Sequence, residues 1–258
     1  MQNLKVTLIQ ADTAWRDVPA NLARLDRIVP SLRGATDLVL LPEMFTTGFT
    51  MEPGSVAEGM DGSTVRQMTA WADILQADVA GSVVAAENNR FFNRLVWARP
   101  GGTMEIYDKR HLFRMAGEEK IYTAGERLIT AEIRGWRIRP FICYDLRFPA
   151  WSRSRGLEYD VAVYAANWPE SRSLHWKTLL RARAIENQCY VIGVNRIGTD
   201  GNGVRYRGDS MAIDFSGAVI ADCASRECVQ SVELDCRALQ KYRGSFPAWK
   251  DADSYTFQ

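Results

Sequence analysis

A cysteine stands where a protein could mount a nucleophile. Cys143 ends the strand-like run 138–142, and the segment that follows is compatible with a helix and carries Pro149, a residue suited to a first helical turn. A thiol at such a junction can be held at a sheet edge with backbone N–H groups beside it. Because free cysteine is also among the most buried residue types, Cys143 taken alone would fit a core position. Its chemical meaning depends on the residues that accompany it.

A glutamate and a lysine occupy comparable junctions. The apolar run 37–41 is typical of a fully buried strand, and Glu43 follows it after one proline. Residues 94–98 and 104–107 flank a Pro-Gly-Gly turn and indicate a hairpin, and Lys109 comes just beyond it. Either charged residue taken singly could be an ordinary solvated side chain. The three residues together form a more specific pattern than any one of them.

The segments around these residues resemble the three catalytic motifs of the nitrilase superfamily of carbon–nitrogen hydrolases. In chain order the motifs are Leu41-Pro42-Glu43, Tyr107-Asp108-Lys109-Arg110-His111-Leu112-Phe113 and Cys143-Tyr144-Asp145-Leu146-Arg147-Phe148-Pro149. The resemblance covers nearly the whole chain and continues through residues 164–168, 175–176, 181–188, 208–210 and 246–247. Within the superfamily the sequence is similar to the omega-amidase branch, which hydrolyses the terminal amide of 2-oxo-dicarboxylic acid monoamides such as 2-oxoglutaramate.

The resemblance implies a role for each motif residue in hydrolysing a small carboxamide to carboxylate and ammonia. An amide is a poor electrophile with a poor leaving group, so a covalent route that splits the reaction into two steps helps. Cys143 would be the nucleophile, and Glu43 the general base, since a thiol with a pKa of about 8.5 is mostly protonated at neutral pH. The Lys109 ammonium and the Tyr144 backbone N–H would stabilise the oxyanion. No metal and no cofactor is implied.

A fourth residue of the family pattern would be a second glutamate that orients the substrate and the lysine. It is expected downstream of the lysine motif and shortly before a turn, and here the segment 117–125 contains Glu118 and Glu119 side by side. Counting back from Gly125 favours Glu118. The register leaves Glu119 open, and a solvated charge pair on a loop is the structural alternative for both.

The substrate expected from the resemblance carries a carboxylate remote from the amide, which a planar, bidentate arginine would suit. Arg172 is our first candidate, and Arg147 and Arg114 are the others. Arg147 lies inside the motif after Cys143, so it could instead form a structural ion pair. Trp168 and Tyr122 could form the walls of a small pocket.

Other activities stay open at the level of sequence. An N-carbamoyl-amine or nitrile hydrolase would belong to the same superfamily, and a non-catalytic metabolite-binding or scaffold protein is the alternative from another class, because fold does not fix function. His111 and His175 could each suggest a cysteine–histidine pair with Cys143, although glutamate and lysine already complete the motif set. The glycine-rich segment 198–203 does not match a phosphate-binding loop and is expected to be a flexible turn.

Composition is consistent with a metabolic enzyme. The chain has 258 residues and a formal net charge of +1, which gives no electrostatic reason to expect nucleic acid or an anionic membrane as a partner. No apolar run is long enough to span a bilayer, and the N-terminus enters a strand without a signal-peptide pattern. The five cysteines are odd in number and lack paired CxxC spacing, which argues against a disulfide framework or a zinc site. We expect a cytoplasmic protein.

The pattern of elements predicts one α/β domain over residues 1–258. Strand candidates at 4–9, 38–41, 79–85, 138–143, 161–165 and 189–194 alternate with helices at 21–32 and 64–75, and a hairpin at 210–220 precedes a strand at 229–234. The resemblance implies a four-layer αββα sandwich of the nitrilase type, which periodicity alone would not distinguish from a single doubly wound sheet. It also implies a homodimer, paired through a helix at 149–155 that carries Trp151 and through a C-terminal tail with Phe246, Pro247 and Trp249.

Overall fold

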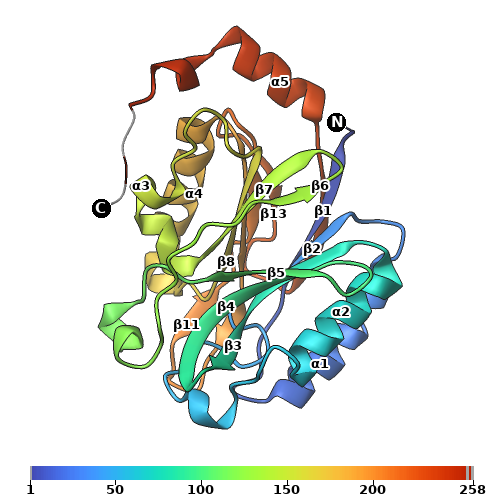
Figure 1. Ribbon diagram of the computed structural model, residues 1–258, viewed down its shortest axis with the longest axis vertical. Helices are drawn as coiled ribbons and strands as arrows, with labels where there is room; N and C mark the ends of the chain where they lie inside the picture. The colour runs from blue at the N-terminus through green and yellow to red at the C-terminus, as the bar shows by residue number, and fades with distance from the viewer. Residues whose placement is uncertain (1, 254–255, 257–258) are drawn as a thin grey trace.

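The computed structural model describes residues 2–253 and 256, and its centre is a pair of six-stranded sheets (Figure 1). The first sheet has the strand order β14-β1-β2-β3-β4-β5. Within it, β1, β2 and β3 run parallel and the remaining neighbours pair antiparallel. The strands are β1 (Leu4–Gln10), β2 (Leu38–Leu40), β3 (Asp78–Glu87), β4 (Arg90–Ala98), β5 (Met104–Asp108) and β14 (Cys228–Leu234).

The second sheet has the order β13-β12-β9-β8-β7-β6. Its central strands β7, β8 and β9 are parallel, and the outer neighbours are antiparallel. The strands are β6 (Ala131–Ile133), β7 (Trp136–Ile142), β8 (Val161–Ala166), β9 (Tyr190–Asn195), β12 (Met211–Ile213) and β13 (Val219–Asp222). A separate small hairpin is made by β10 (Ile197–Thr199) and β11 (Arg205–Arg207).

Helices form the two outer layers. α1 (Val18–Asp26) and α2 (Ser63–Leu75) cover the first sheet, whereas α3 (Pro149–Ser152) and α4 (Ser173–Asn187) lie on the side of the second (Figure 1). α5 (Cys236–Ser245) follows β14 at one end of the molecule. The 3₁₀ turns are η1 (Val29–Leu32), η2 (Pro53–Ser55), η3 (Arg114–Ala116), η4 (Glu118–Lys120), η5 (Cys143–Arg147), η6 (Glu170–Arg172) and η7 (Ala248–Asp251). The predicted four-layer αββα sandwich is confirmed.

The apolar run after Asp37 shows why this architecture needs strands that are hydrophobic on both faces. Leu38 and Leu40 belong to the core between the two sheets, whereas Val39 and Leu41 pack in the core beneath α2. Successive strand residues point to opposite faces, so a strand buried on both sides reads as a continuous apolar run. Each strand expected from the sequence is present, with its ends shifted slightly.

Two expected helices differ from the structure. The helix expected over 21–32 ends at Asp26 and is followed by the 3₁₀ turn η1, because Pro30 lacks the N–H that would bond to the Asp26 carbonyl and its ring would clash with it. The helix expected over 149–155 ends at Ser152. Trp151 lies in the core of its own chain and donates its indole N–H to the Tyr107 hydroxyl at 2.9 Å, so the expectation that it forms a dimer interface is wrong.

Among the helices within residues 2–253, none has the length and apolar character that a membrane span requires.

Candidate active site

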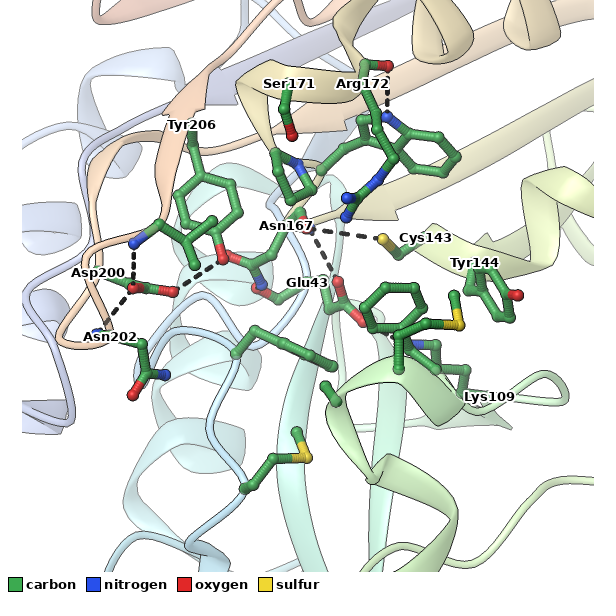
Figure 2. Close-up of a pocket in the computed structure, with 18 of the residues that line it drawn as sticks. Glu43, Lys109, Cys143, Tyr144, Asn167, Ser171, Arg172, Asp200, Asn202 and Tyr206 are labelled. Atoms are coloured by element: carbon green, nitrogen blue, oxygen red, sulfur yellow. Dashed lines mark hydrogen bonds and ion pairs between the residues drawn. The ribbon is translucent and has the colours of Figure 1, made fainter.

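The three motif residues lie together because each follows the end of a strand at the same end of the sandwich. Glu43 comes shortly after β2, Lys109 directly after β5, and Cys143 directly after β7 of the opposite sheet. Figure 2 shows their side chains converging beside one cavity. Glu43 and Lys109 are fully buried, whereas Cys143 is half-buried. The fold therefore brings Glu43, Lys109 and Cys143 together, as the sequence predicts.

The Lys109 ammonium lies between two carboxylates. Its Nζ is 2.8 Å from Glu43 Oε1 and 2.9 Å from Glu118 Oε2, and it faces the Phe49 ring at 5.0 Å from the ring centroid. Glu118, and not Glu119, is the member of the acidic pair that contacts Lys109 among the described residues, and it is fully buried. The 3₁₀ turn η4 holds it there, and Glu118 Oε2 also accepts the Phe113 backbone N–H at 2.6 Å.

Asn167 joins the carboxylate to the thiol. Its backbone N–H donates to Glu43 Oε2 at 2.8 Å, and its backbone carbonyl lies 3.8 Å from Cys143 Sγ. The Asn167 side chain donates to the Glu43 backbone carbonyl at 2.6 Å and so ties the two segments together. Glu43 Oε2 is consequently the carboxylate oxygen on the side of the thiol (Figure 2).

These contacts set the protonation states of the site. Burial raises the pKa of the Cys143 thiol well above its usual range, and the negative charge of Glu43 raises it further. Burial alone would lower the pKa of Lys109, but the carboxylates of Glu118 and Glu43 outweigh it and raise that pKa. At neutral pH the site therefore holds a neutral thiol and a charged ammonium. Burial also raises the pKa of Glu118, against the pull of the Lys109 charge.

The backbone at Cys143 is a sharp turn held by an aspartate. Cys143 has a φ of 40°, in the left-handed region that is uncommon for a residue with a side chain, and it opens the 3₁₀ turn η5. Asp145 Oδ2 accepts the Ile142 N–H at 3.0 Å, and Asp145 Oδ1 accepts the His111 N–H at 3.0 Å. The N–H of Tyr144 lies in the first turn of η5, where backbone N–H groups have no partner within the turn.

Neither histidine pairs with the thiol among the described residues. His111 Nδ1 lies 2.8 Å from Asp145 Oδ1, and its ring stacks on Phe148 with a centroid separation of 3.8 Å. His175 Nδ1 lies 3.0 Å from Arg147 Nη2. The cysteine–histidine alternative thus has no geometric support.

A cavity of about 400 Å³ opens beside Cys143. Its walls combine apolar and polar side chains, which suits a small ligand with a few fixed polar groups. Besides the motif residues, the cavity is lined by Phe49, Phe113, Tyr144, Arg147, Trp168, Arg172, Asp200, Asn202 and Tyr206, among others.

Both Trp168 and Arg172, which the sequence suggested, lie in the cavity wall. The Trp168 indole donates to the Arg172 backbone carbonyl at 2.8 Å, and Arg147 stacks over the Trp168 ring at 4.8 Å. Arg147 thus lines the cavity, and it forms no ion pair with a carboxylate in the part of the chain that the structure describes. Arg114 does not line the cavity. Tyr122 is also outside it, because it is buried and donates its hydroxyl to the Thr50 carbonyl at 2.7 Å.

Sequence reasoning missed a wall of the cavity and one buried amide. The glycine-rich segment 198–203 is a turn, as predicted, but it is the turn of the β10–β11 hairpin and brings Asn202 to the cavity. Asp200 fixes this turn by accepting the Asn202 N–H at 2.9 Å and the Tyr206 hydroxyl at 2.9 Å. Asn93, in β4, contacts both Glu43 and Glu118. The sequence signal that could have identified Asn93 is an asparagine on a strand face that it shares with apolar residues.

The described residues also contain no group of three or more histidine, cysteine, aspartate or glutamate side chains arranged to hold a metal ion. The site itself provides a thiol, two carboxylates, an ammonium and backbone N–H groups, which suit nucleophilic attack on a carbonyl and stabilisation of an oxyanion.

Comparison with known proteins places this geometry in a family. Residues 5–244 match the family model of carbon–nitrogen hydrolases. The omega-amidase YafV of Escherichia coli is 50% identical over 256 residues, which is 99% of each chain. A 2-oxoglutaramate amidase of Bacillus subtilis is 30% identical over 95% of this chain and 96% of its own.

A solved structure agrees with these matches. XC1258 from Xanthomonas campestris, a CN-hydrolase superfamily protein, superposes with a TM-score of 0.98 at 43% identity, covering 100% of both chains. The resemblance inferred from the motifs, including the similarity to omega-amidases, is confirmed. The chain belongs to the carbon–nitrogen hydrolase family and is an enzyme of that family.

Proposed function

We propose that this enzyme is an omega-amidase that hydrolyses the terminal amide of 2-oxoglutaramate or 2-oxosuccinamate through a thioester on Cys143. The observation that carries the mechanism is the position of the Glu43 carboxylate, which touches the Lys109 ammonium and lies beside the Cys143 thiol. The identity to proteins named omega-amidase and 2-oxoglutaramate amidase supports the substrate.

Acylation uses all three groups. Because the resting thiol is neutral, Glu43 takes its proton as Sγ attacks the amide carbon. The carbonyl oxygen becomes an oxyanion, which the Lys109 ammonium and the Tyr144 N–H stabilise. Glu43 then gives the proton to the departing nitrogen, so ammonia leaves and a thioester remains.

In deacylation Glu43 again acts first as a base and then as an acid. Glu43 takes a proton from a water molecule, which attacks the thioester, and the oxyanion forms again beside Lys109. Collapse of this intermediate releases the carboxylic acid and returns the proton to Cys143. Glu118 orients the ammonium throughout, since two oxygens of this carboxylate contact Nζ.

Arg172 is the group we assign to the remote carboxylate of the substrate. Its guanidinium faces the Phe113 ring at 5.5 Å and has no ion-pair partner among the described residues. The guanidinium of Arg147, by contrast, already contacts His175 and the Trp168 ring. A planar guanidinium on an aromatic face suits bidentate binding of a carboxylate.

The assignment is tested with Arg172→Met. Losing a charge-assisted hydrogen bond should lower kcat/KM for 2-oxoglutaramate about tenfold to a hundredfold. The same variant should hydrolyse butyramide, which lacks the carboxylate, as fast as wild type. Arg114→Met, outside the cavity, is the matched control and should leave both substrates unaffected. An equal loss of kcat/KM for the two amides would show that Arg172 does not bind the substrate carboxylate.

The substrate class is tested by ammonia release from a panel of simple amides, omega-amides of 2-oxo acids, N-carbamoyl compounds and nitriles. The proposal expects the highest kcat/KM for the omega-amides of 2-oxo acids. A higher value for a carbamoyl compound or a nitrile would refute the substrate assignment while leaving the family unchanged.

The proposal extends to a cytoplasmic homodimer. All five cysteines are free, as a reducing compartment requires. Ile185 and Phe246 are exposed apolar side chains, and we take them as the ends of one candidate interface patch. Ile185 lies against Gly217, and Tyr242 links Phe215 to Phe246 with ring separations of 4.8 and 6.3 Å. Burying such a patch against a second copy would remove apolar area from water.

Phe246→Glu should shift the protein from dimer to monomer in light scattering at micromolar concentration, because a charge would be buried at the interface. The control is Ile74→Glu, which alters an exposed apolar residue on α2 at the first sheet and should leave the dimer intact. A monomeric wild type with full activity would disprove the assembly.

A further inference from the structure

A buried amide of β4 connects the two carboxylates of the site. Asn93 Nδ2 donates to Glu43 Oε1 at 2.7 Å and to Glu118 Oε1 at 3.2 Å. The Asn93 side chain is completely buried, and it does not line the cavity. Its amide therefore acts on the carboxylates and not on a ligand in the cavity.

A serine on the neighbouring strand fixes the orientation of this amide. Ser82 in β3 pairs with Leu95, so Asn93 is its diagonal neighbour on the same face of the sheet. The Ser82 hydroxyl donates to Asn93 Oδ1 at 2.8 Å. Rotating the amide by half a turn would aim its oxygen at two carboxylates, which is electrostatically unfavourable. The amide nitrogen must therefore face the glutamates.

The same serine supports the backbone beside Glu43. Ser82 Oγ accepts the Met44 N–H at 2.9 Å, and Met44 has a φ of 43°, in the left-handed region. The Ser82 and Asn93 pair thus holds Glu43 at its backbone and at its carboxylate. A strained residue next to a functional side chain persists only where its surroundings fix it.

The contacts divide the two oxygens of Glu43 between two tasks. Oε1 accepts from Asn93 Nδ2 and from the Lys109 ammonium at 2.8 Å, so two donors occupy it. Oε2 accepts the Asn167 N–H and is contacted by neither Asn93 nor Lys109, and it is the oxygen on the side of the thiol. An oxygen already bound by two donors is a poor site for a further proton.

We infer that Asn93, held by Ser82, is a positioning residue that presents Glu43 Oε2 to Cys143 as the proton acceptor and keeps Glu43 and Glu118 apart while both share Lys109. The inference rests on the proposed function, because it acts through Glu43 as the general base. In the proton transfer the Sγ–H bond breaks, the Oε2–H bond forms, and the sulfur electron pair forms the bond to the amide carbon.

The test variant is Asn93→Leu, which keeps the approximate volume and removes both donors. With the amide that wild type hydrolyses best, kcat should fall about tenfold to a hundredfold, since hydrogen bonds to a charged group are lost, while KM stays within about twofold. Thr7→Val, a change at a buried hydroxyl of the same sheet that bonds the Ser231 hydroxyl, is the matched control and should leave kcat unchanged.

The pH profile distinguishes positioning from mere packing. Hydrogen bonds to a carboxylate favour its charged form, so losing them should move the acid limb of kcat/KM to higher pH. Asn93→Asp should move it further, because a third carboxyl then faces the pair. The position of the acid limb on the pH scale reflects several interacting groups and not Glu43 alone. The titratable or charged residues that face Glu43 are Lys109, Glu118, Tyr122, Cys143 and Tyr206. An acid limb equal to that of wild type in both variants would overturn the inference.

Two further measurements make the test independent of folding and of the substrate. Should Asn93→Leu fail to fold, Ser82→Ala, which frees Asn93 Oδ1, is expected to lower kcat and raise the acid limb in the same directions; no change in either contradicts the inference. A carbon-13 NMR titration of the Glu43 carboxyl needs no turnover. An upward shift of its pKa in Asn93→Asp supports the inference even if no 2-oxo amide is hydrolysed, and an unchanged pKa refutes it.

Discussion

Cys143→Ala is expected to abolish turnover, with kcat reduced by at least about a thousandfold, because no other group can form the thioester. Cys143→Ser should come close to the same loss. The fold should persist in both variants, since the side chain is small and half-buried, and its turn is held by Asp145 through backbone N–H groups. Thermal melting followed by circular dichroism checks that point beside the assay.

The control for this substitution is Cys228→Ser. Cys228 is a half-buried free cysteine at the start of β14 and does not line the cavity. Its replacement should leave kcat unchanged. Cys189 is a less suitable nucleophile, because its side chain is completely buried and does not line the cavity. Retained activity in a well-folded Cys143→Ala protein would refute the mechanism.

Glu43→Gln is expected to lower kcat by about a hundredfold or more while making the Cys143 thiol easier to ionise. The amide keeps the shape of the carboxylate but cannot accept the thiol proton. Since the charge of Glu43 raises the pKa of Cys143, removing that charge should lower this pKa. The thiolate fraction, followed by its ultraviolet absorbance with Cys143→Ala as the blank, should therefore rise as activity falls.

Lys109→Met should change the pKa of the Cys143 thiol in the opposite direction. The Lys109 charge lowers the pKa of the thiol, so its loss should raise that pKa, and kcat should again fall by about a hundredfold or more because the oxyanion loses its cation. Glu52→Gln, at an exposed carboxylate, is the neutral control. If Glu43→Gln gained activity along with thiolate, thiol ionisation and not base catalysis would limit the reaction.

The strand ends that carry Glu43, Lys109 and Cys143 could be predicted because apolar runs and turn residues are local signals. The carboxyl ends of parallel strands also meet at one edge, which is why Asn167 after β8 lies beside Cys143 after β7. That pairing was within reach of the sequence, since both residues directly follow buried runs. Predicting this contact required one further inference, namely that β7 and β8 are neighbours in the sheet.

Other parts of the site depend on tertiary contacts that no local pattern encodes. The choice of Glu118 over Glu119 follows from the 3₁₀ turn η4, which aims one of two adjacent carboxylates inward. Trp151 was misassigned because an indole can be buried by its own chain or by a partner, and only the fold shows that Tyr107, His111 and Arg110 of its own chain surround it. Asn93 was missed because Leu95 and Trp97, which share its face of the strand, are core residues and give no local sign of a polar site.

The most direct test of the central claim is to stop the reaction with 2-oxoglutaramate by rapid acid quench and to measure the intact mass and the modified peptide. The account predicts an acyl adduct on Cys143, formed after ammonia has left and absent from Cys143→Ala. An adduct on Cys189, or turnover at full rate after Cys143 has been alkylated, would contradict it.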